Sequence, residues 1–148
     1  MKVEVQGLDE LVSLLGALSD SDTVLRAAKD GLMRVGKAIQ VTAQELCCVD
    51  TSELHDNIET TELVGGVDVG TNVKQGFYEE YGTGRQGDPS VTHTDKEMWS
   101  YMDDDGKWHT TRGHEPHPFL YPALKAHESE ISPFVKEALQ EEIDRHRR

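Results

Sequence analysis

The sequence contains very little cysteine. Its two cysteines, Cys47 and Cys48, are adjacent in a chain of 148 residues, and because neighbouring side chains point in different directions, a disulfide between them is not expected. The first residues, MKVEVQG, do not have the character of a secretory leader, so we expect a protein made for a reducing cytosol. No run approaches the roughly 18 apolar residues that a membrane span needs, and no membrane partner is expected.

Basic residues are scarce as well. The formal net charge is −13, and no lysine or arginine occurs between Lys37 and Lys74. Such a surface repels phosphate groups, so ordinary nucleic-acid binding through counterion release is disfavoured. The plain role of these charges is solvation. The carboxylates of this stretch are Glu45, Asp50, Glu53, Asp56, Glu59, Glu62 and Asp68.

The motifs of common catalytic sites are also absent. The sequence has neither a G-x-S-x-G nucleophile elbow nor a cysteine-protease frame. The run GTGRQG lacks the Lys-Ser or Lys-Thr ending of a phosphate-binding loop, and DDDGKWHTTRGHE lacks the alternating ligands of a calcium loop. We therefore expect a protein that is not an enzyme and that has no cofactor.

Histidines gather in one region of the chain. Four of the seven histidines, His93, His109, His114 and His117, lie in or beside the stretch from residue 85 to residue 113. His114 and His117 have an H-x-x-H spacing, but no half of an H-E-x-x-H or C-x-x-C frame accompanies them. Exposed or hydrogen-bonded loop histidines are the simpler interpretation, so no metal ligand is assigned.

The apolar residues that are present follow regular periods. Residues 2–6 alternate as in a short strand, and residues 8–18 have the spacing of a short amphipathic helix. After a separating run, SDSDT, a longer amphipathic helix is predicted, with Arg26, Lys29, Arg34 and Lys37 on its polar face. This basic face could dock on the acidic stretch of a neighbouring copy. The predicted apolar face consists of Leu25, Ala28, Leu32, Val35, Ile39, Ala43 and Leu46.

Further along the chain, the pattern changes to short β-prone runs. IETTELVGGVDVGT predicts a hairpin with a primed turn at its paired glycines. Residues 73–84, which end in glycines, fit a short helix or a strand that runs into a loop, and we favour the helix. Residues 85–113 predict a loop insertion that contains a second hairpin, turning at Asp103–Gly106. Residues 122–148 predict a C-terminal helical segment, with Pro122 at its first position and a kink or a new start at Ser132 and Pro133.

These segments together predict one domain of the α+β class over residues 1–148. At this length a chain buries roughly two-thirds of its unfolded surface, which is enough for a real core. The predicted architecture is a long amphipathic helix packed on a small antiparallel β-sheet, with an extended hairpin loop and a C-terminal helix.

A proline-rich stretch, HEPHPFLYPAL, precedes the final helix. Its prolines, Pro116, Pro118 and Pro122, never fall three apart, so it is not a P-x-x-P ligand. The fixed φ angles of the prolines keep such a chain extended. We therefore expect Phe119 and Leu120 to be buried in the core or in a partner groove at a smaller cost in conformational entropy.

Two further motifs concern turns. In VDTSEL, Asp50 and Thr51 can cap a turn through their side-chain oxygens, and Leu54 is an apolar anchor. In EYGTG, the backbone can take a positive φ or approach another chain closely at Gly82 or Gly84.

In this order the motifs resemble the gene-product-ten-like tail-component proteins of long-tailed bacteriophages, also called tail-completion or head-tail joining proteins. The resemblance runs from GLDEL through V-D-T-x-x-L, Y-x-E-Y-G-T, W-x-Y and D-x-D-G-K-W to P-x-P-F-L-x-P-A before the terminal helix. The chain departs from the family at Ser52, where glycine is common, and at Pro133. The residues marked for structure or interaction are Asp50, Thr51, Leu54, Tyr78, Glu80, Tyr81, Gly82, Thr83, Trp99, Trp108, Pro116, Pro118, Phe119, Leu120, Pro122 and Ala123.

The resemblance implies a virion structural protein without catalysis, assembled in the host cytoplasm. It would form a ring, expected to be a hexamer, at the neck between the head connector or stopper and the tail terminator and tube. A closed ring needs two complementary surfaces on each copy, and the hairpin around Trp99 and Trp108 is the expected arm onto a neighbour or the tail. The carboxylates from Glu45 to Asp68 could line a lumen past which DNA slides without adhering.

Three alternatives stay open at this point. A tail terminator belongs to the same class. A small histidine-rich metal-dependent hydrolase would use the histidines as ligands, and a free acidic protein could mimic DNA to occupy a host factor.

Overall fold

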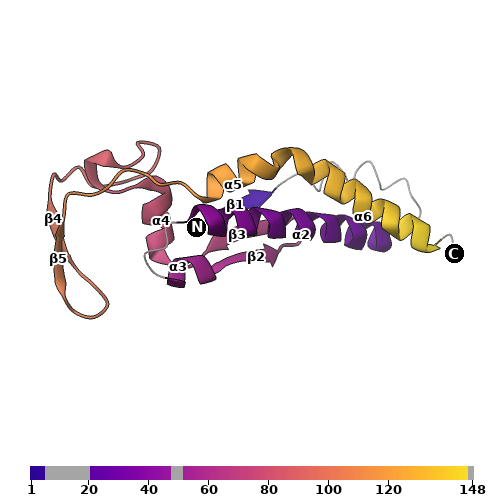
Figure 1. Ribbon diagram of the computed structural model, residues 1–148, viewed down its shortest axis with the longest axis horizontal. Coiled ribbons are helices and arrows are strands. Elements are labelled where there is room, and N and C mark those ends of the chain that lie inside the picture. Colours follow the sequence, from indigo (N-terminus) through magenta and orange to yellow (C-terminus); the bar gives the residue numbers. More distant parts are fainter. Residues whose placement is uncertain (6–20, 48–51, 147–148) are drawn as a thin grey trace.

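The computed structural model describes residues 1–5, 21–47 and 52–146. It has an elongated body of helices and a small sheet, with a separate hairpin at one end (Figure 1). This is the α+β architecture that the periodicities predict. The helix predicted over residues 8–18, together with Asp50, Thr51 and Cys48, lies outside the described residues.

Helix α2 (Ser21–Leu46) is the longest element. It includes the last three residues of the run SDSDT, and Asp22 in its first turn suits the positive end of the helix dipole. The middle of the predicted apolar face is buried, Leu25 near its start is partly buried, and near its end Leu46 is 48% exposed and Cys47 is buried instead. Cys47 follows Ala43 by four residues and so stays on the buried face, whereas Leu46 is rotated away from it. The residues of this face with no exposure are Ala28, Val35, Ile39 and Ala43.

The sheet has three antiparallel strands, β1 (Lys2–Val5), β2 (Ile58–Glu62) and β3 (Val67–Thr71), with β3 in the centre. Helix α2 packs closely on this sheet at Gly36, where a Cβ atom would lie 2.7 Å from Thr60 and 2.8 Å from Val67. Glycine is therefore required at this position for close packing.

The predicted β2–β3 hairpin is confirmed, but its primed turn is wrong. No residue between the two strands has a positive φ, and the Leu63 N–H donates to the Gly66 carbonyl at 3.0 Å. The central positions are then Val64 and Gly65, and a β-branched residue resists the positive φ that a primed turn demands.

The C-terminal segment comprises α5 (Leu120–His127), a 3₁₀ turn (Glu128–Glu130) and α6 (Ile131–His146). Pro133 falls in the first turn of α6, so the predicted break is a new helix start. Both helices pack along α2, on which the sheet also packs (Figure 1). A Cβ atom at Gly31 of α2 would lie 2.6 Å from the Val135 Cα atom, so the α2 and α6 backbones are in close contact.

The remaining elements lie toward the hairpin end of the molecule. They are α3 (Ser52–Asp56), α4 (Lys74–Tyr81), a 3₁₀ turn (Gly84–Gln86), β4 (Trp99–Met102) and β5 (Trp108–Thr111). The predicted helix over residues 73–84 and the second hairpin are therefore confirmed. Strands β4 and β5 form a two-stranded sheet of their own, at the opposite end of the molecule from the end of α6 (Figure 1).

Candidate interaction site

Helix α4 ends at a glycine that no other residue could replace without strain. Gly82 has φ 68° and ψ −176°, a region of backbone space that is essentially reserved for glycine. A Cβ atom there would lie 2.7 Å from the His114 carbonyl oxygen and 2.8 Å from the Pro116 nitrogen. The predicted positive φ is confirmed, and the segment that approaches this glycine belongs to the same chain.

The carboxylate of Glu80 caps a helix that is distant in sequence. This side chain is buried, and its oxygens accept the backbone N–H groups of Phe119 at 2.8 Å, Leu120 at 2.9 Å and Tyr121 at 2.9 Å. The first N–H groups of a helix have no partner within the helix, and Pro122 brings no N–H of its own. Helix α5 therefore begins at Leu120, two residues before the predicted start at Pro122, because Glu80 satisfies its first donors.

The chain returning from the hairpin is hydrogen-bonded to the end of α4. The Thr83 N–H donates to the His114 carbonyl at 2.9 Å, and the His114 N–H donates to the Thr83 hydroxyl at 3.3 Å. The His117 N–H donates to the Glu79 carbonyl at 2.7 Å. We call residues 79–84 and 113–118 the junction, because they join the hairpin to the body.

We call β4, β5 and their turn the arm. Its outer part exposes large apolar side chains: Trp108 is 68% exposed and Met102 is 57% exposed. These two residues pair directly across the strands, so they lie on one face of the hairpin. Tyr101 is also half exposed and stacks on His109, with ring centroids 5.5 Å apart. Trp99, at the base of the arm, is only partly exposed and lies against Gly84.

The turn of the arm is organised by Asp103. Its carboxylate accepts the Lys107 N–H at 2.8 Å and the Asp105 N–H at 3.1 Å, and it contacts His109 Nε2 at 2.6 Å. These hydrogen bonds, that of Lys107 foremost, hold the pKa of Asp103 below its ordinary value. Gly106, with φ 78°, completes the turn, as the DDDG run predicts.

The structure separates the marked residues into core, junction and surface. Leu54, Phe119, Leu120 and Ala123 have no exposure, so Phe119 and Leu120 fill the core of their own chain and not a partner groove. Tyr78 is half exposed. Pro118 is exposed, whereas Tyr81, Thr83, Pro116 and Pro122 are partly buried.

Sequence reasoning missed one grouping of side chains at the junction. Glu79, His114 and His117 each offer a ligand atom, and these atoms lie within 4.8 Å of one another. The third ligand was hidden because Glu79 lies on α4, far along the chain from the histidines. Glu79 and Glu80, adjacent in sequence, do not act as a pair, since Glu80 binds the α5 backbone and Glu79 faces His117.

The basic face of α2 is largely engaged within its own chain. Lys29 binds Glu62 at 2.8 Å, and Arg34 makes a bidentate contact with Glu141 of α6. The hydrogen bond from Arg34 keeps the pKa of the Glu141 carboxyl below its ordinary value. Two of the four cations predicted to dock on a neighbouring copy, Lys29 and Arg34, therefore already bind carboxylates of their own chain.

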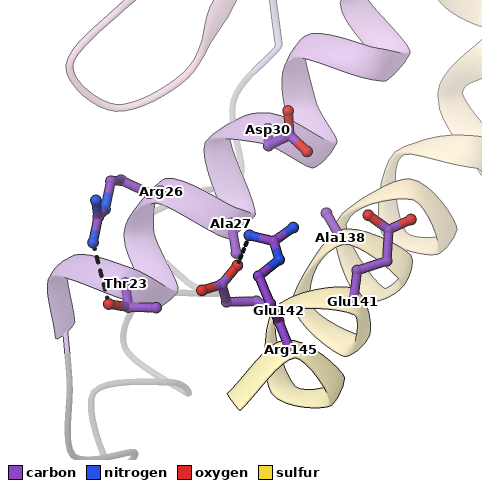
Figure 2. A pocket seen from close by; sticks show the side chains of 8 residues that line it. All are labelled: Thr23, Arg26, Ala27, Asp30, Ala138, Glu141, Glu142 and Arg145. Carbon is purple, nitrogen blue, oxygen red and sulfur yellow. Dashed lines mark hydrogen bonds and ion pairs between the residues drawn. The ribbon is translucent and has the colours of Figure 1, made fainter. Parts of the chain in front are cut away.

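A charged pocket of about 350 Å³ opens between the start of α2 and the end of α6 (Figure 2). Ala27 and Ala138 line it, and Arg145 binds Glu142, one turn before it on α6, at 2.5 Å. Its charged side chains come from both helices, so the pocket is a polar seam between α2 and α6. It lies at the end of the body away from the arm (Figure 1).

Comparison with known proteins adds no relative. No protein-family model matches the chain, and no significant match was found among curated proteins or solved structures. Within residues 1–5, 21–47 and 52–146, no helix is long and apolar enough to cross a membrane.

Proposed function

We propose that this chain is a non-enzymatic structural protein of a bacteriophage virion, a tail-completion or head-tail joining component that forms a ring at the neck. The observation that carries the proposal is the arm. An isolated two-stranded hairpin is marginally stable in water, yet this one extends from the body with Met102 and Trp108 exposed on one face. Large exposed aromatic and methionine side chains are typical of interface centres.

The resemblance motifs support the same proposal. Y-x-E-Y-G-T and P-x-P-F-L-x-P-A are far apart in sequence but meet at the junction, where Glu80 binds the start of α5. The junction fixes the direction of the arm relative to the body. An arm of fixed direction, contacting the body of the next copy, makes the heterologous contact that closes a ring.

Fewer carboxylates are available to line the proposed lumen than the sequence suggests. Glu62 is paired with Lys29, and Asp68 is buried beside Lys2 at 3.3 Å. Glu53, Asp56 and Glu59 of α3 and β2 are exposed and, among the described residues, bind no lysine or arginine, so they are the better candidates for a wall past which DNA slides. A structure of the assembled ring with these three on its outer wall would overturn this part of the proposal.

Deleting the gene and imaging the particles tests the joining role. We expect filled heads that are not joined to apparently finished tails. Overlong tails would indicate a tail terminator instead, and normal virions would rule out both roles.

A metal-dependent hydrolase is the second candidate, favoured by the grouping of Glu79, His114 and His117. This candidate predicts turnover of chromogenic ester or phosphoester substrates by zinc-loaded protein, lost in His114→Ala. Equal rates in the variant and the original protein would exclude it.

A further inference from the structure

We propose that Glu79, His114 and His117 bind one divalent transition-metal ion, with Zn²⁺ as the natural occupant. Two imidazole nitrogens and one carboxylate oxygen are ligands that Zn²⁺ commonly takes, with a fourth position left for water or another group. The three ligand atoms lie within 4.8 Å of one another. His117 Nδ1 is 3.8 Å from Glu79 Oε2, against about 3.4 Å between two ligands in a tetrahedral zinc site. A small rotation of the exposed His117 side chain closes that difference.

The hydrogen bond made by His114 sets its ring in the form that a metal needs. His114 Nδ1 lies 2.9 Å from the Glu115 carbonyl oxygen. A carbonyl only accepts, so Nδ1 carries the proton and Nε2 keeps its lone pair in the neutral ring. A backbone carbonyl on the second nitrogen is a usual support of metal-bound histidine.

The backbone around the ligands is already fixed before any metal binds. The His117 N–H bond to the Glu79 carbonyl and the paired bonds between Thr83 and His114 hold both histidines against the end of α4. Gly82 permits this approach because it has no Cβ atom. Little additional ordering is therefore required on binding, which favours affinity.

A metal at this position would tie α4 to the chain that returns from the arm. Glu79 is partly buried, whereas His117 is 57% exposed, so the open coordination position faces solvent. The proposed role is a clamp at the base of the arm. It does not depend on the phage assignment, since metal binding is measured on the isolated chain.

Titration of metal-free protein with Zn²⁺, and separately with Co²⁺, tests the site. We expect saturation at one equivalent and a Co²⁺ visible spectrum of histidine-ligated, low-coordinate type. His114→Ala, His117→Ala and Glu79→Gln should each weaken Zn²⁺ binding by about tenfold or more. His93→Ala is the matched control, because its ring contacts the Val91 carbonyl outside the cluster, and its affinity should be unchanged.

Thermal unfolding gives a second readout. Zn²⁺ should raise the unfolding temperature of the original protein in proportion to its occupancy and leave the double variant His114→Ala/His117→Ala unmoved. In metal-free buffer His117→Ala should leave the unfolding temperature nearly unchanged. A loss of Zn²⁺ binding by this variant could then not be explained by a loss of folding. Absence of saturable binding by the original protein, or equal binding by a folded Glu79→Gln or double variant, would overturn the proposal.

Discussion

The body of this molecule buries large apolar side chains, whereas the arm exposes side chains of the same kind. In the body, Phe119 and Leu120 have no exposure and join the face of α2 and the sheet in one core. In the arm, Met102 and Trp108 are more than half exposed. Burial of apolar surface stabilises the body by roughly 25 cal/mol per Å², whereas the arm keeps its apolar surface in water, free for a partner. The body therefore carries the stability, and the arm is available for interaction.

The junction makes this division possible. A flexible connection would let the arm point in many directions, and association would then cost the entropy of fixing it. Here Glu80 binds three backbone N–H groups, and Gly82 and Gly84 let two segments meet closely. Variants of the core, the junction and the arm should accordingly differ in effect.

Replacing both Phe119 and Leu120 with alanine should have the largest effect. Each truncation leaves a cavity, and together they should cost roughly 5–10 kcal/mol, as much as the whole free energy of unfolding of many domains. We expect a chain without a cooperative thermal transition, measured by circular dichroism. Tyr121→Ala, at an adjacent position that is 58% exposed, is the control. A double variant that unfolds near the original temperature would contradict this view of the body.

Glu80→Gln should have the next largest effect. A carboxamide keeps one acceptor oxygen and places an NH₂ group where the second carboxylate oxygen accepted an N–H. At least one buried donor at the start of α5 loses its partner, at a cost of about 2–4 kcal/mol. Chemical denaturation measures the loss. Glu79→Gln in metal-free buffer, on the same helix, should change stability by less than about 0.5 kcal/mol. Equal effects of the two changes would mean that Glu80 does not cap α5.

The same two glutamates show how far the sequence predicts this structure. Periodicity identifies Leu32 and Ile39 as buried because the apolar pattern is local to their helix. The role of Glu80 depends on N–H groups 39 residues away, and no local pattern reports such a pairing. His114 and His117 have an H-x-x-H spacing but no recognised metal-binding motif around them, because the third candidate ligand, Glu79, is on α4. The turn over Asp103–Gly106 was predicted correctly because aspartate and glycine favour turns through their own chemistry. The turn between β2 and β3 was predicted at the paired glycines, but its central residues are Val64 and Gly65.

Gly82→Ala and Gly106→Ala compare the junction with the arm directly. Both glycines have positive φ, 68° and 78°, so each change adds backbone strain of about 1–3 kcal/mol. At Gly106 nothing lies within 4 Å of the added Cβ atom, whereas at Gly82 it meets the backbone of His114 and Pro116. Gly82→Ala should therefore cost about 1 kcal/mol more than Gly106→Ala by denaturant titration. The reverse order would mean that the contact between α4 and the returning chain is loose.

Trp108→Ala should have the smallest effect on stability and the clearest effect on association. A side chain that is 68% exposed contributes little to the core, so the free energy of unfolding should change by about 0.5 kcal/mol or less. Trp99→Ala is the matched comparison, because Trp99 packs on Gly84 at the base of the arm and its loss should lower stability by about 1–3 kcal/mol. If the arm contacts a neighbouring copy or the tail, Trp108→Ala protein should fold normally yet fail to restore joined virions when supplied to a gene deletion. An exposed indole lowers solubility, so we expect Trp108 to be retained for a contact. If virions with Trp108→Ala join normally, the contact is made by another surface. The exposed aromatic residues of α4, Phe77 and Tyr78, would then be changed next.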